Sequence, residues 1–349
     1  MGEIIIHIIP AIGCGFVLQL ILHELGHLIS GLFTGWKFLY LQIYRLVFKR
    51  VNNKLKLIIV GDIGYKCIMY PKSINNNAML YTMGGCISNL IFATLGLIAV
   101  IIISMSPVMW LYTWSFTAFG IGLLFMNGKA STKRVCNDKA CYNLLKMNKH
   151  NVMCHNAQLI IAKHLMEGLT YKEIGEELIC LSPDIAKNDI QAYQAVLEYY
   201  YFLDSNNYLK MGQAINKIRS YGNISREVLE IVEQELMYIR LLCAIILKSK
   251  ALHENNSDKL GWNMYKGQRG AMDIHTERIK AVYDAYVLFN KGYKDKAIEA
   301  LNKALKRLEK GSSVYEGERK FCVKQLMEVK SIIESTIIKI VPEKTYAVL

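Results

Sequence analysis

The sequence predicts a mainly α-helical, polytopic membrane protein with a membrane-associated β-hairpin or sheet and a C-terminal domain of α-helical repeats. Three observations lead to this fold class: three long apolar segments, a stretch rich in β-branched and aromatic residues between the first two, and helical periodicity through the C-terminal half. Each apolar segment has close to the roughly 20 residues that a helix needs to cross a bilayer. The three spans are expected at about 4–29, 78–103 and 108–126.

Charge divides the chain into two domains. Between Ser73 and Gly128 the sequence contains no Asp, Glu, Lys or Arg, whereas charged residues recur every few positions from Lys129 onward. We therefore expect a membrane domain at 1–148 and a soluble domain at 149–349. A cleaved signal peptide is not expected, because the first apolar segment is too long and no basic residue precedes it.

Basic residues predict on which side of the membrane the loops lie. Eight Lys or Arg residues and a single acid lie between the first two apolar segments, and more basic residues follow the third. Because positively charged loops tend to remain in the cytoplasm, we expect a multi-pass cell-membrane protein with residues 30–77 and the whole C-terminal domain on the cytoplasmic side. The nine cysteines show no paired spacing, as is usual in a reducing compartment.

The net charge of +13 also bears on partners. We interpret it as orientation in the membrane plus attraction to anionic lipid, so the lipid bilayer is an expected partner. No basic helix or recognised motif predicts nucleic-acid binding, and no nucleic-acid partner is expected.

The sequence HELGH ends the first apolar segment. On a helix, His23 and His27 lie on one face and can bind one metal ion, while Glu24 is close enough to act as general base toward a metal-bound water. Polar groups within a membrane are costly unless they are satisfied, and they usually mark function. The sequence therefore predicts a Zn²⁺ site with Glu24 as its catalytic residue.

A catalytic zinc site needs a third protein ligand from elsewhere in the chain. Asp138 follows the third span on the same side of the membrane as the HELGH segment, so the two regions can meet. Asp62 is typical of a turn between strands. His150 and His155 are expected at the surface of the soluble domain.

Three segments resemble the site-2 protease family of intramembrane zinc metalloproteases. These segments are HELGH, MGGCISNL at 83–90 and NGKASTKRVCNDK at 127–139, and the resemblance covers about 15–145. It implies that His23, His27 and Asp138 bind the metal. It also implies that Glu24 is the base and that Gly85, Asn89 and Asn127 hold the substrate or the reacting centre.

The chain departs from the family pattern at three positions. Ala130 replaces a proline and Lys139 a glycine in the third segment, and Cys86 replaces a proline in the second. Independently of the family, the small residues of MGGCISNL allow helices to approach closely, and Asn89 offers an amide inside the membrane.

The stretch at 36–71 predicts β-structure against the cytoplasmic leaflet, with a turn at Asn52-Asn53. An exposed edge there would bind an extended substrate by strand addition, which exposes the peptide bonds that a helix hides. A simple amphipathic sheet packed on the helices is the alternative. Strands are expected near 38–48, 54–60 and 64–70.

The soluble domain has tetratricopeptide-like periodicity. The clearest match, at 281–311, predicts two antiparallel helices joined at Gly292-Tyr293. A weaker copy at 197–218 has its turn at Ser205–Asn207. The segment 162–178 is a further candidate, with a helix-turn-helix fragment in GLTYKEIGEEL as the alternative interpretation. A generic helical bundle is the alternative.

The pattern as a whole predicts an intramembrane zinc endopeptidase that cleaves a membrane-embedded protein or peptide near the cytoplasmic leaflet. The alternative is a catalytically silent membrane scaffold whose helical repeats bind a peptide or protein partner. The intact HELGH sequence favours the enzyme, and the departures in the third segment favour the scaffold.

Overall fold

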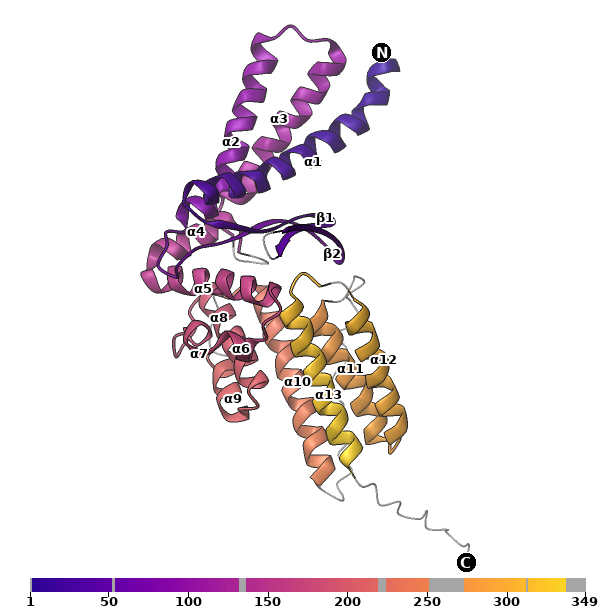
Figure 1. Ribbon diagram of the computed structural model, residues 1–349. Helices are drawn as coiled ribbons and strands as arrows, with labels where there is room; N and C mark the ends of the chain where they lie inside the picture. The colour runs from indigo at the N-terminus through magenta and orange to yellow at the C-terminus, as the bar shows by residue number, and fades with distance from the viewer. Residues whose placement is uncertain are drawn as a thin grey trace, which may run out of the picture. The chain divides into compact units, whose positions relative to one another are not determined.

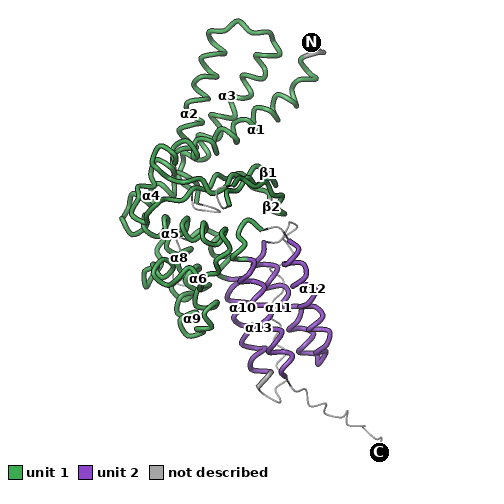
Figure 2. The backbone as a smooth tube through the Cα atoms, viewed as in Figure 1, with its two compact units in different colours: residues 1–232, 312–318 green, residues 233–311, 319–349 purple. Residues whose placement is uncertain are grey.

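The structure is a computed structural model that describes residues 2–51, 54–131, 136–218, 224–250, 273–311 and 313–336. The chain is mainly helical and forms two compact units, coloured separately in Figure 2. The first unit contains residues 1–232 and 312–318, and the second contains 233–311 and 319–349. The boundary predicted at 148/149 therefore falls inside the first unit.

Three helices are long and apolar enough to cross a membrane: α1 (Gly2–Phe33), α2 (Met79–Ile102) and α3 (Pro107–Gly128). They correspond to the three apolar segments of the sequence, and α1 continues to Phe33. The α3 helix begins as Pro107 suggests: Ser106 caps it by accepting a hydrogen bond from the Met109 N–H, and proline occupies the first turn, where no N–H is required.

Glycines allow α1 and α2 to pack with backbones in contact. A Cβ added to Gly26 would collide with the Gly84 carbonyl oxygen and the Ser88 side chain, and one added to Gly84 would collide with the backbone of Gly26. The Ser88 hydroxyl also donates to the Leu22 carbonyl at 2.7 Å. This is the small-residue contact that apolar helices use where hydrophobic burial cannot drive association.

A two-stranded antiparallel hairpin connects α1 to α2 (Figure 1). It consists of β1 (Lys37–Val51) and β2 (Lys54–Tyr70). The segments expected as strands near 54–60 and 64–70 both lie in β2, and each of them pairs with β1. The register shifts between Tyr44 and Leu46 of β1, and the extra residues of β2 lie opposite this shift. Tyr44 has a φ of 58° there.

The rest of the first unit is a layer of helices beside the hairpin. It contains α4 (Asp138–Met147), α5 (Lys149–Met166), α6 (Tyr171–Ile174), α7 (Glu176–Ile179), α8 (Asp189–Asp204) and α9 (Tyr208–Asn216). One hydrophobic core joins this layer to the long apolar helices and the hairpin. Its buried members are Trp36, Cys67, Met69, Ala78, Tyr81, Leu145, Cys154 and Ile190.

The weaker repeat candidates have different outcomes. The turn expected at Ser205–Asn207 does connect α8 to α9. By contrast, 162–178 is no helical hairpin: it contains the end of α5 and the single-turn helices α6 and α7. Gly168 and Gly175, at φ values of 93° and 99°, interrupt the helix there.

The second unit contains α11 (Ile274–Asn290), α12 (Lys294–Lys310) and most of α10 (Arg226–Lys250) and α13 (Glu316–Ser335). The antiparallel pair predicted at 281–311 is present as α11 and α12, with Gly292 at a φ of 84° in the turn. In the core, the guanidinium of Arg278 donates to both carboxylate oxygens of Glu235 at 2.6 Å and stacks over Tyr238. Tetratricopeptide character stays a prediction.

Candidate metal centre

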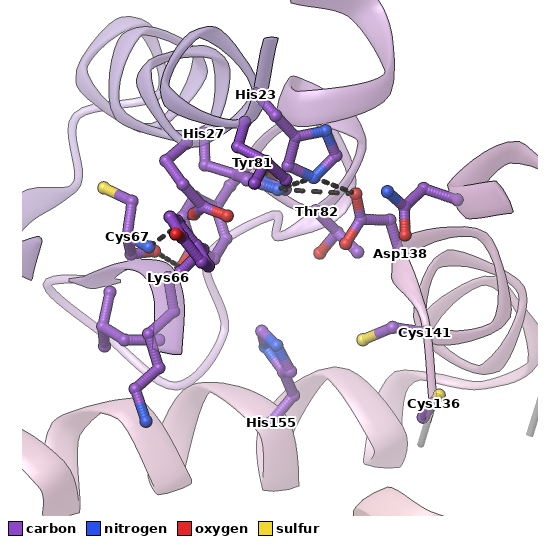
Figure 3. Close-up of a pocket in the computed structure, with 15 residues that line it drawn as sticks. His23, His27, Lys66, Cys67, Tyr81, Thr82, Cys136, Asp138, Cys141 and His155 are labelled. Atoms are coloured by element: carbon purple, nitrogen blue, oxygen red, sulfur yellow. Dashed lines mark hydrogen bonds and ion pairs between the residues drawn. The ribbon is translucent and has the colours of Figure 1, made fainter. Parts of the chain in front are cut away.

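Three side chains from distant parts of the chain converge near the end of α1. His23 and His27 lie one turn apart on α1, and Asp138 is the first residue of α4 (Figure 3). One carboxylate oxygen, Oδ2 of Asp138, lies 3.2 Å from Nε2 of His23 and 3.4 Å from Nε2 of His27. The two Nε2 atoms are 3.4 Å apart. The third ligand predicted from sequence is thus in contact with the first two.

This triangle has the dimensions of one face of a tetrahedral metal site. Zinc binds nitrogen and oxygen at about 2.0–2.2 Å, so two tetrahedral ligands lie about 3.3 Å from each other. The observed separations of 3.2, 3.4 and 3.4 Å match this value. The three residues therefore fit a zinc ion, and three protein ligands leave the fourth position for a water molecule or substrate.

The remaining ring nitrogens of the two histidines have partners that suit metal binding. Nδ1 of His27 lies 2.8 Å from the Tyr81 carbonyl oxygen, which can only accept a hydrogen bond. The proton of His27 is therefore on Nδ1, and the lone pair of Nε2 faces the triad. Partners of this kind orient metal-binding histidines and raise their basicity.

Asn89 serves His23 in the same way. Its amide is fully buried and lies 3.1 Å from Nδ1 of His23, while its oxygen has no hydrogen-bond partner among the described residues. Half a turn of the amide exchanges nitrogen for oxygen. In that orientation the oxygen would accept from Nδ1–H and Nε2 of His23 would keep its lone pair for a metal, while the amide nitrogen would take the unpartnered position. Asn89 thus contacts a predicted ligand directly.

Glu24 lines the same cavity as the triad and is positioned by the hairpin. Its carboxylate is buried and accepts a hydrogen bond of 2.6 Å from the Cys67 N–H of β2. The carbonyl of Cys67 in turn accepts from the Tyr81 hydroxyl at 2.9 Å. The carboxylate does not belong to the ligand group, so it is available as a base beside that group.

Asp138 owes its position to the residue before it. Asn137 caps α4 by accepting from the Ala140 N–H, and its side-chain amide donates to the carbonyls of Met126 and Lys129 at 2.8 Å. Asn137 therefore connects the end of α3 to the start of α4.

Two other residues of the predicted site lie beside the triad. A Cβ added to Gly85 would overlap both histidine rings, with His27 Nε2 at 2.6 Å, so α2 can approach the triad only with glycine there. Asn127 lines the cavity into which the triad opens. Cys86, where the family has proline, donates its thiol to Oδ2 of Asp138 at 3.7 Å.

The triad and Glu24 open into a cavity of about 470 Å³. Its wall also contains residues that sequence patterns did not indicate: Tyr65, Lys66, Cys67 and Ile68 of β2, together with Tyr81. These residues come to the site through the pairing of the hairpin and its packing on α2. Burial raises the pKa of the Cys67 thiol to about 12, so this thiol is protonated and unreactive at neutral pH.

The other three residues considered as metal ligands lie away from the triad or on a different wall of the cavity. Asp62 lies within β2 rather than in a turn, and its side chain is outside the described residues. His150 does not line the cavity, and its ring contacts the Cys154 thiol at 3.5 Å. His155, expected at the surface, instead lines the cavity from α5. No signal in the sequence indicated this, because it depends on how α5 packs against β2.

The fold and the site thus define a bundle of three helices long enough to cross a membrane, α1, α2 and α3, with a candidate metal centre at one end. No family model, curated protein or solved structure matches the chain. The assignment of a function therefore rests on the side chains described above.

Proposed function

We propose that the protein is an intramembrane zinc endopeptidase that cleaves a membrane-embedded protein or peptide near the cytoplasmic face. The observation that carries this proposal is the triangle of His23, His27 and Asp138, whose dimensions fit one zinc ion, with Glu24 next to it. When bound there, zinc would lower the pKa of a water molecule and polarise a peptide carbonyl. The resemblance to the site-2 protease family supports the same activity.

Glu24 is suited to move the proton in this reaction. As a buried carboxylate beside the triad, it can take a proton from the attacking water and deliver it to the nitrogen of the leaving amine. The Cys67 N–H fixes one of its oxygens, so the other remains free to exchange the proton. The role requires no further acid, because a single carboxyl group carries the proton in both directions.

The outer edge of β2 supports binding of an extended substrate. The N–H and C=O of Cys67 bond to Glu24 and Tyr81, so both point away from β1. By the alternation of an antiparallel strand, the peptide group of Tyr65 also faces this outer edge, and Tyr65 lines the cavity. A substrate that adds to the edge at Tyr65 would hold its peptide bonds beside the base.

The proposal also assigns the site to one side of the membrane. The end of α1, the start of α2 and the end of α3 lie on the side of the hairpin and α4 (Figure 1). We assign this side to the cytoplasm because its loops carry most of the basic residues. The helices of the second unit would then be cytoplasmic, with tetratricopeptide-like surfaces that bind a protein or peptide partner.

The test uses the full-length protein in lipid nanodiscs with a library of single-span membrane peptides, with products identified by mass spectrometry. Glu24→Gln should abolish cleavage while zinc remains bound at one equivalent, and His27→Ala should lose both. Glu167→Gln, which changes the exposed acid that follows α5 as its C-cap, is the matched control and should behave as wild type. A wild-type protein that binds no zinc and cleaves nothing would instead favour the scaffold.

A further inference from the structure

Helix α5 forms the wall of the cavity opposite the triad, although it lies beyond the segments that predicted the site. Figure 3 shows the ring of His155 pointing from α5 into the space below His27 and Asp138. The proposed chemistry gives this histidine no role. It is therefore a hydrogen-bonding group in the cavity whose purpose is still open.

The position of His155 is firmly fixed. The next residue, Asn156, donates its side-chain amide to the carbonyls of Ile74 and Asn76 at 3.0 and 2.7 Å, which attaches α5 to the loop before α2. The ring of Trp36 lies beside His155, at 6.5 Å between centroids, and stacks on Tyr81 at 4.5 Å. Tyr81 is the residue whose carbonyl orients His27. His155 and the triad thus share one supporting cluster.

The ring has hydrogen-bonding capacity that this packing does not use. Nδ1 of His155 is buried and has no hydrogen-bond partner among the described residues. Burial lowers the pKa of His155 to about 4, although an interaction with the Asn156 side chain acts to raise it. At neutral pH the imidazole is uncharged and offers one N–H donor and one nitrogen acceptor.

We propose that His155 is a substrate-binding residue that forms a hydrogen bond with the backbone of an uncharged, extended peptide lying between α5 and β2. A peptide group presents a donor and an acceptor, and one nitrogen of an uncharged imidazole can pair with either of them. The proposal rests on the proposed protease function and extends it, because the substrate would be held on one side by the β2 edge and on the other by α5. The α4–α5 segment is then part of the active site.

The experiment measures inhibitor binding rather than turnover. Full-length protein in nanodiscs is loaded with Co²⁺, and two probes are titrated while the visible spectrum of the metal is followed. Acetohydroxamate reaches only the metal, whereas an acetyl-Leu-Leu hydroxamate also fills the cavity with two peptide groups. His155→Phe keeps an aromatic ring and removes both nitrogens, and His150→Phe is the matched control one turn earlier on the same helix, outside the cavity.

His155→Phe should weaken the peptide hydroxamate about three- to tenfold, as expected for the loss of one neutral hydrogen bond. Affinity for acetohydroxamate and for Co²⁺ should not change, and His150→Phe should match wild type. His155→Gln, which keeps a donor and an acceptor, should retain most of the affinity. If His155→Phe does not fold, the smaller His155→Leu takes its place.

Three results would overturn the inference. Equal affinity of wild type and His155→Phe for the peptide probe would show that the imidazole does not contact substrate. Equal weakening of both probes would show that His155 acts through the metal centre. Failure of the wild-type protein to bind Co²⁺ would refute the metal site itself, so this outcome is distinguishable from the other two.

Discussion

Asn89→Ala should weaken zinc binding without removing a ligand. Asn89 is fully buried, and its amide is the only described side-chain partner of Nδ1 of His23, at 3.1 Å. His27 is oriented by a backbone carbonyl, so it keeps its partner in the variant. Loss of a partner of this kind typically costs 10–100-fold in metal affinity, which corresponds to about 1.4–2.7 kcal/mol.

The lower part of this range is expected, because only one of three ligands loses its orientation. The assay is competition between the detergent-solubilised protein and a fluorescent zinc chelator at pH 7.5. Thr94→Ala on the same helix is the control, since among the described residues the hydroxyl of Thr94 bonds within α2, to the Leu90 carbonyl. Unchanged affinity in Asn89→Ala would refute the orienting role, and complete loss of zinc would show that the substitution disrupts the packing of α1 and α2.

The remaining predictions concern packing, pH and topology. Gly85→Val should abolish metal binding, measured by zinc content, because its side chain would overlap both histidine rings. Lowering the pH from 7 to 5 should destabilise wild type more than His155→Gln, by about 2 kcal/mol in thermal unfolding. Burial lowers the pKa of His155 to about 4, so the unfolded chain binds a proton at a higher pH than the folded protein does. The free energy of unfolding therefore falls between pH 7 and pH 5. Truncation after Asn148 should destabilise the first unit, seen as a lower melting temperature, because Cys154 and Ile190 belong to its core. A tag placed after Leu349 should be inaccessible from outside intact cells, and labelling there would refute the orientation.

Local pattern was enough to predict part of the site. The two histidines and Glu24 lie within five consecutive residues of one helix, so their relative positions follow from helix geometry alone. Gly85 and Asn89 are also one turn apart, on the next helix. The apolar lengths of α1, α2 and α3 are likewise set by composition, and they correspond to the expected spans.

Residues that depend on tertiary packing could not be predicted in the same way. His155 reaches the cavity only because α5 packs on β2, and a sequence period gives no information on that contact. Cys67 acts through its backbone N–H, which every residue except proline possesses. The segments expected as separate strands, near 54–60 and 64–70, lie in one strand that pairs with β1, a long-range contact that the local pattern does not determine.

The proposed base, Glu24, and one candidate metal ligand, His27, are joined through a continuous series of hydrogen bonds. His27 bonds to the carbonyl of Tyr81, the hydroxyl of Tyr81 bonds to the carbonyl of Cys67, and the N–H of Cys67 bonds to Glu24. Because Glu24 and His27 are on the same helix, these bonds close a loop that passes through the hairpin. In the proposed reaction, a shift of β2 that broke these hydrogen bonds would move Glu24 relative to His27, so the position of the hairpin would control the activity of the site.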